Sequence, residues 1–208
     1  MNYLKNILSL YLLIFLGVSL NAQTVTVTGQ VNTPSGDPLT NISLTMTTGQ
    51  QTLTTTTDNE GNYTFVDVPQ NALVTLKPTS TPSLNPLNGV STFDVVQGSK
   101  HILGLTPFDA AYKYIAMDVN LSGSVTVSDL ILIRQLILGL ISEIPDTDAW
   151  RFIEETQLAS IKFDQSEMPE YSTDYPAIDF TPNADGLVTL NFVGVKVGDS
   201  SGNATSDF

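Results

Sequence analysis

The chain contains no cysteine, a single histidine and few basic residues. Of its 208 residues, 21 are Asp or Glu and only 8 are Lys or Arg, so the formal net charge is −13. Without cysteine the chain has no disulfide bonds, and it has too few zinc ligands for a zinc site. The shortage of Lys and Arg argues against nucleic-acid binding, because those side chains neutralise the phosphates.

Catalytic signatures are also missing. The one histidine, His101, follows Lys100, and the chain has no Gly-x-Ser-x-Gly elbow, so the sequence does not indicate a Ser-His-Asp triad. A glycosidase needs two positioned carboxylates in a cleft. The carboxylates here cluster at metal-ligand spacing or are scattered through predicted loops. We therefore expect a protein that is not an enzyme, with His101 in a structural role.

Residues 1–22 have the composition of a secretory signal peptide. Lys5 supplies the positive charge, Ile7 to Leu20 is apolar, and Asn21-Ala22 precedes an expected cut at Gln23. The apolar run is about 14 residues long, shorter than the roughly 20 needed to cross a bilayer. We expect cleavage, a secreted or cell-surface protein, and no membrane span in the mature chain.

The part of the chain from 23 to 79 predicts a β-sandwich. Residues 24–31 alternate between Thr and apolar side chains with the period of a half-buried strand. Similar short segments follow and are separated by turn clusters, of which 34–38 is the clearest. Regularly spaced short strands with turns between them are typical of sandwiches. The further predicted strands are residues 42–46, 52–57, 63–66 and 72–76.

Three motifs in this part carry a resemblance. Gly29-x-Val31, Gly36 to Leu39, and Thr57 to Pro69 resemble the carboxypeptidase-regulatory-like or collagen-adhesin (Cna) B-type, prealbumin-like sandwich. Such domains serve as stalks and spacers, and related sandwiches bind starch. Tyr63 and Phe65 alternate on one strand and are expected in the core rather than on a sugar-binding platform. A linker, residues 78–83, ends this domain.

The segment 118–140 joins an oxygen-rich loop to an apolar helix. An EF-hand-type calcium loop takes ligands at positions 1, 3, 5, 7, 9 and 12, with Gly at position 6. Gly123 occupies position 6 here. We therefore predict a Ca²⁺ site at this second loop. Its predicted ligands are Asp118, Asn120, Ser122, Ser124 through its carbonyl, Thr126 and Asp129.

The same unit occurs once before, because residues 90–105 align with 125–140 at a constant offset of 35. Counting back from Asp94 as position 12 puts Ser83 at position 1 and Leu87, which cannot ligate, at position 5. This first loop should therefore bind calcium more weakly. Asp199 is a further candidate for the carboxylate that the first loop lacks. The predicted ligands of the first loop are Asn85, Asn88, Gly89 through its carbonyl, Ser91 and Asp94.

The two repeats resemble a dockerin, the bacterial module of paired calcium loops and helices that docks onto a cohesin. The resemblance spans about residues 85–199 and implies a mainly α module at 83–205 with a cohesin-like partner. By this resemblance, partner contacts come from the ends of the loops and from the helix faces, although the usual Ser-Thr pair is absent. The implied contact residues are Thr92, Phe93, Ser99, Lys100, Val127, Ser128, Arg134 and Gln135.

The sequence thus predicts two domains, an N-terminal all-β sandwich and a C-terminal, mainly α dockerin-like module. The leading hypothesis is a secreted, non-catalytic protein whose calcium-bound module mediates protein assembly, in polysaccharide breakdown or surface adhesion. One alternative is a carbohydrate-binding protein in which the sandwich binds a polysaccharide. Another is the tail of a larger extracellular hydrolase.

Overall fold

The computed structural model describes residues 23–49, 51–80, 85–161, 177–183 and 186–206. The predicted signal peptide at 1–22 lies outside these residues. So does the part of the predicted linker that includes Ser83, the expected first position of the first loop.

Five strands form in the first part of the chain, close to their predicted positions. In β1, Val25, Val27 and Val31 are buried and the Thr and Gln side chains between them are more exposed, because successive side chains of a strand point to opposite faces. The strands are β1 Thr24–Asn32, β2 Ser43–Thr48, β3 Thr52–Thr56, β4 Asn62–Pro69 and β5 Val74–Thr79.

From residue 85 onward, the described chain contains short helices and further strands. The two helices that follow the loops each begin with a capping box, formed by Ser91 and Asp94 in one and by Thr126 and Asp129 in the other. The helices are α1 Thr92–Ile102, α2 Ala111–Met117, α3 Val127–Ile137 and α4 Glu155–Ser160. The strands are β6 Trp150–Glu154, β7 Ile178–Phe180, β8 Leu187–Thr189 and β9 Phe192–Lys196.

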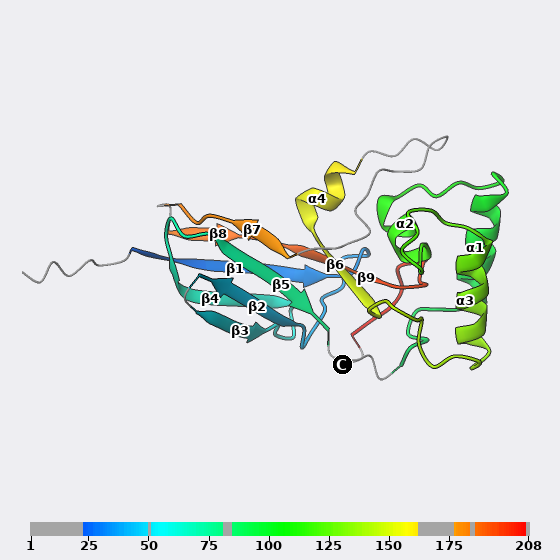
Figure 1. Cartoon of the computed structure of the whole chain (residues 1–208), viewed down its shortest axis with the longest axis horizontal. Helices are drawn as coiled ribbons and strands as arrows, with labels where there is room; N and C mark the ends of the chain where they lie inside the picture. Colours follow the sequence, from blue (N-terminus) through cyan, green and yellow to red (C-terminus); the bar gives the residue numbers. More distant parts are fainter. Residues whose placement is uncertain (1–22, 50, 81–84, 162–176, 184–185, 207–208) are drawn as a thin grey trace, which may run out of the picture.

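Strands from both ends of the chain share the two sheets. One sheet has the order β4-β1-β9-β6, with β8 also paired to β1, and the other has the order β3-β2-β5-β7. Both β8 and β9 run parallel to β1, whereas β7 is antiparallel to β5. In Figure 1 the orange and red strands accordingly lie among the blue and cyan ones.

The predicted fold class, an all-β N-terminal domain followed by a mainly α C-terminal module, is wrong. The described residues are mostly β, with nine strands and four short helices. Strands β6 to β9 all come from the region expected to be mainly α. The reason is pairing between segments that are distant in sequence, because β9 pairs with β1 and with β6.

Two hydrophobic cores lie on either side of β6 and β9. We call one the sandwich core, which includes Leu44, Trp150 and Phe192, and the other the helix core, which includes Ile133 and Val195. Both strands contribute to both cores, because their side chains alternate between the two faces. Figure 1 shows β6 and β9 between the strands and the helices.

Helices α1 and α3 lie side by side at the far end of the molecule from β3 and β8 (Figure 1). Gly98 of α1 lies close to the neighbouring helices. A Cβ atom there would come within 2.7 Å of Leu130 in α3 and 2.8 Å of Met117 in α2. Within the described ranges, no helix is both long enough and apolar enough to cross a bilayer.

Candidate functional site

The second loop connects α2 to α3 and has a carboxylate at each end. Asp118 is the C-cap residue of α2, and Asp129 is the third residue of α3. Both side chains are fully buried, with no exposed surface. Between them, Gly123 has a φ of 81°, which suits the sharp turn expected at position 6.

Hydrogen bonds hold both carboxylates against the loop. Oδ1 of Asp118 accepts from the Ser122 N–H at 2.9 Å, and Oδ2 accepts from the next N–H at 2.8 Å. Oδ1 of Asp129 accepts from the Asn120 N–H at 3.3 Å, and Oδ2 accepts from the Thr126 N–H and hydroxyl. The Ser122 hydroxyl donates to the carbonyl of residue 124 at 3.1 Å. The structure thus brings together Asp118, Asn120, Ser122, Ser124, Thr126 and Asp129.

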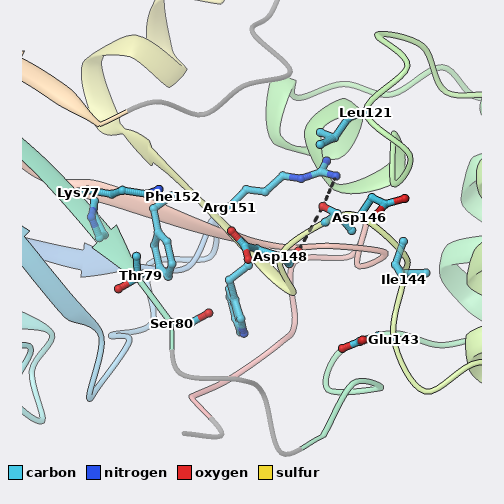
Figure 2. A pocket seen from close by; sticks show the side chains of 13 residues that line it. Lys77, Thr79, Ser80, Leu121, Glu143, Ile144, Asp146, Asp148, Arg151 and Phe152 are labelled. Carbon is cyan, nitrogen blue, oxygen red and sulfur yellow. Dashed lines mark hydrogen bonds between the residues drawn. The ribbon is translucent and has the colours of Figure 1, made fainter.

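The side chain of Arg151, in β6, anchors the start of this loop. It is only 4% exposed, and its guanidinium donates to three carbonyls, those of Ile115, Asp118 (2.9 Å) and Val119 (3.3 Å). It also donates to the Thr147 hydroxyl at 3.1 Å. Figure 2 shows the side chain reaching from β6 toward α2. Arg151 therefore fixes the backbone from which the Asp118 carboxylate projects.

The first loop has the same capping arrangement before α1. Oδ2 of the fully buried Asp94 accepts from the Ser91 N–H at 2.9 Å and from its hydroxyl at 3.0 Å. The Asn88 side chain exchanges two hydrogen bonds with the Thr205 backbone. The exposed Asn85 accepts from the backbone N–H two residues further on. The side-chain oxygen of Asn85, one of the predicted ligands, is thus hydrogen-bonded within its own turn.

Asp199 lies against this loop beside Asp94. Oδ1 of Asp94 accepts from the Ser200 hydroxyl at 3.1 Å and from the Ser201 N–H at 3.0 Å. Oδ1 of Asp199 accepts from the Ser201 hydroxyl at 2.7 Å and from the Gly202 N–H at 2.8 Å. Asp199 is 2% exposed. The carboxylate of residue 199 is therefore placed next to the first loop, close to Asp94 and Gly89.

The surroundings of Asp199 disfavour the ionised form of its carboxyl group. Burial raises the pKa of the Asp199 carboxyl, and the nearby Asp94 carboxylate raises it further, against hydrogen bonds from Ser201, Ala204 and Gly202. Among the described residues, no ion pair joins a basic side chain to either carboxylate. A divalent cation between them would remove both penalties on the charged form.

The space at the first loop depends on Gly89. This residue has a φ of 74°, and a Cβ atom there would lie 2.6 Å from Oδ2 of Asp199 and 2.6 Å from Ala204. A side chain at this position would therefore displace the Asp199 carboxylate. In the second loop, where Gly123 lies one position earlier in the repeat, a Cβ atom on that glycine would meet no atom within 4 Å.

The donor atoms of both loops suit calcium better than a transition metal. They are carboxylate, hydroxyl, amide and carbonyl oxygens, which are the ligands that Ca²⁺ takes in proteins. Over the described ranges, no group of three or more His, Cys, Asp or Glu side chains is placed to hold a metal. Each site has two carboxylates, of which Asp199 supplies one to the first site from outside the loop, so neutral oxygens would have to complete either site.

The residues expected to contact a partner lie on the outer faces of α1 and α3. Phe93 and Val127 are each 59% exposed, and Ser99 and Gln135 are partly buried. The Ser99 hydroxyl donates to the carbonyl one turn before it, at Val95. The remaining members of the set are exposed, namely Thr92, Lys100, Ser128 and Arg134.

Apolar side chains are exposed in matching positions of the two repeats. Val96 of α1 and Ile131 of α3 are 48% and 49% exposed. After the helices, Leu103 and Leu138 are both 70% exposed, and the leucines two residues further on are similarly exposed. We call these side chains, together with Lys100 and Arg134, the paired-helix face. Large apolar side chains that are exposed at equivalent positions of a repeat are candidates for an interaction site.

A cleft, two core aromatic residues and the histidine lie outside the two predicted calcium sites and the paired-helix face. A cleft of about 710 Å³ separates the end of β5 from the segment 143–152, and Lys77, Glu143 and Asp148 line it (Figure 2). Tyr63 and Phe65 are 2% and 4% exposed, so they form no platform for a sugar. His101 stacks on a phenylalanine ring, and burial lowers its pKa.

Comparisons with known proteins assign no family. No family model matches the chain, and no curated protein matches it. Among solved structures, it is similar to a C-terminal fragment of the pilus adhesin SpaC from Lactobacillus rhamnosus GG, with a TM-score of 0.26 and 11% identity. That match covers 31% of this chain, and this chain spans 27% of the adhesin fragment.

Proposed function

We propose that this is a non-catalytic extracellular protein that binds calcium at two loops and docks through its paired-helix face onto another protein, as dockerins do onto cohesins. The observation that carries the proposal is a repeated arrangement. Each of α1 and α3 begins at a buried carboxylate, Asp94 or Asp129, and each exposes apolar side chains at equivalent positions.

Calcium binding is supported by the cost of burying these acids. Removing a carboxylate from water costs on the order of several kcal/mol unless other groups compensate for the lost solvation. At the second loop, Asp118 and Asp129 would hold the ion together with the neutral oxygens between them. At the first loop, Asp94 and Asp199 would do so with oxygens of residues 88, 89 and 91.

Docking is supported by the composition of the paired-helix face. The acids of the two helices, Asp94 and Asp129, are buried, and the exposed charged side chains on these helices are Lys100 and Arg134. This face is therefore apolar and basic in a chain of net charge −13. Such a face favours a partner that offers apolar surface together with carboxylates.

The calcium sites are tested on residues 23–208 by calorimetric titration and thermal melting, in calcium and in chelator. We expect two bound ions and a melting temperature that rises with calcium, because an ion that binds the folded chain stabilises it. Asp118→Ala with Asp129→Ala should remove one ion and most of this rise. If the double variant in chelator melts like the calcium-loaded parent, the assignment of the second site is wrong.

The docking face is tested with a panel of purified, immobilised cohesin domains. We expect calcium-dependent binding by the parent chain and its loss in Val96→Asp with Ile131→Asp. The matched control is Val66→Asp on β4, because Val66 is also exposed, at 61%, and lies outside the helices. Failure of the parent to bind any domain of the panel, or equal binding by the double variant, would count against docking through this face.

A further inference from the structure

Residues 199–206, which we call the closing segment, run from one core to the other. Val197, just before the segment, is 2% exposed in the helix core. Ala204, within the segment, is 3% exposed in the sandwich core. One buried side chain just before the closing segment and one near its end therefore hold it against the two cores.

Along its length, the closing segment contacts the first loop. The Ser200 hydroxyl and the Ser201 N–H both donate to Oδ1 of Asp94, at 3.1 and 3.0 Å. The Asn88 amide donates to the Thr205 carbonyl at 2.5 Å and accepts from its N–H at 3.2 Å. These contacts seat the segment directly on the first loop.

The same segment contacts the turn between β1 and β2, residues 33–40. The Ser35 hydroxyl donates to the Gly202 carbonyl at 2.7 Å. The Ser206 hydroxyl donates to the Pro38 carbonyl at 3.2 Å and accepts from the Thr40 N–H at 2.9 Å. One short stretch of chain thus joins the first loop to a turn of the sandwich.

We infer that calcium at the first loop is coupled to this turn through the closing segment. An ion held by Asp94 and Asp199 fixes the Asp199 carboxylate, which accepts from the N–H groups of Gly202 and Ala204 at 2.8 Å each. Gly202 in turn accepts from Ser35, and Ser206, two residues beyond Ala204, makes the contacts to Pro38 and Thr40. The inference rests on the proposed first site.

Coupling of this kind is reciprocal. If the ion stabilises the contacts between the turn and the closing segment, those contacts must raise the affinity for the ion by the same factor. The second loop differs, because the hydrogen bonds described above for its carboxylates come from residues 118–129 and its backbone is anchored by Arg151. Calcium at the first loop, and not at the second, should therefore order the turn.

Hydrogen exchange on residues 23–208 tests the coupling, with and without calcium, in peptides that cover residues 33–41. We expect slower exchange in calcium for the parent and for Asp129→Asn. Asp199→Asn should show no such change. In the reverse direction, Ser35→Ala should weaken calcium binding at the first site by about two- to tenfold, the range for one lost hydrogen bond. Ser142→Ala, at an exposed serine, is the matched control and should leave the affinity unchanged.

The outcomes separate the coupling from the sites themselves. If calorimetry counts two ions but exchange in the turn is unaffected by calcium, or responds equally in Asp199→Asn, the coupling is overturned and the sites stand. If the parent binds a single ion that Asp129→Asn abolishes, the first site fails and the coupling fails with it. Should Asp199→Asn not fold, Ser35→Ala decides alone, because it leaves every proposed ligand in place, and an unchanged affinity then overturns the coupling.

Discussion

Replacing Arg151 by methionine should destabilise the protein more than most core substitutions. The side chain is 4% exposed, and its guanidinium satisfies three carbonyls where α2 ends. Methionine fills much of the same space but donates no hydrogen bond. Those carbonyls would then be buried without these donors at the point where the Asp118 carboxylate is positioned.

The size of the loss follows from the number of contacts. A hydrogen bond from a charged donor contributes about 1.5–3 kcal/mol, and an orphaned buried acceptor costs about 1–3 kcal/mol. These contributions are not additive, and methionine regains some packing. We expect Arg151→Met to lower the free energy of unfolding by about 3–5 kcal/mol. This is a large part of the roughly 5–15 kcal/mol that stabilises a typical domain.

Urea denaturation in calcium and in chelator measures this loss. Arg151→Lys is the matched control, since it keeps the charge but lacks the planar fork that reaches several carbonyls at once. Its loss should be intermediate. Arg151→Met should also weaken calcium binding at the second loop, because the Asp118 backbone is no longer anchored. An unfolding free energy within about 1 kcal/mol of the parent would refute this account of Arg151.

Three further predictions concern single residues. Gly89→Ala should destabilise the chain more than Gly123→Ala, because both residues have positive φ but only at Gly89 would the new Cβ meet Asp199. Gly123→Ala should lower the free energy of unfolding only by the cost of a left-handed backbone conformation, about 1–2 kcal/mol. Equal melting temperatures of the two variants would disprove the contact. Burial lowers the pKa of His101 in the folded chain, so the unfolded chain takes up the proton first and stability should fall as pH drops below 6.5. The substitution His101→Gln should flatten this dependence of stability on pH, and an unaltered dependence would show that other groups cause it. In chelator, the raised pKa of Asp199 means that the folded state holds its proton longer, so stability should fall as pH rises above 3.8. Calcium should oppose that fall, and urea melts of the parent and Asp199→Asn across this range would show whether it does.

Local patterns predicted the first five strands and helices α1 and α3, but not strands β6 to β9 or how the strands pair. The alternation in residues 24–31 gave β1, and the constant offset between the repeats gave both α1 and α3. The segments 150–154 and 192–196 are short and apolar, a pattern that does not distinguish strand from buried helix. Their pairing with each other and with β1 depends on residues far away in sequence, for which the chain carries no local signal.

The candidate sites show the same division. The spacing from Asp118 to Asp129 predicted the loop, and both carboxylates accept hydrogen bonds from its backbone, whereas calcium binding stays a prediction. Nothing in the pattern around Arg151 indicated that it would anchor that loop. Asp199 did have a signal, because Leu87 at a ligand position left the first loop short of oxygens. A calcium site at the first loop would therefore need a carboxylate from elsewhere in the chain.

The parallel pairing of β1 with β8 and β9 also constrains how the molecule folds. Thr26 pairs with Leu187, 161 positions further along the chain. Contacts so distant in sequence slow folding, because a long loop must close before they stabilise anything. Until the last strands emerge, one edge of β1 presents unpaired backbone groups that invite association with other chains. A newly made molecule would thus stay vulnerable to aggregation at this edge until residues 187–196 had been synthesised.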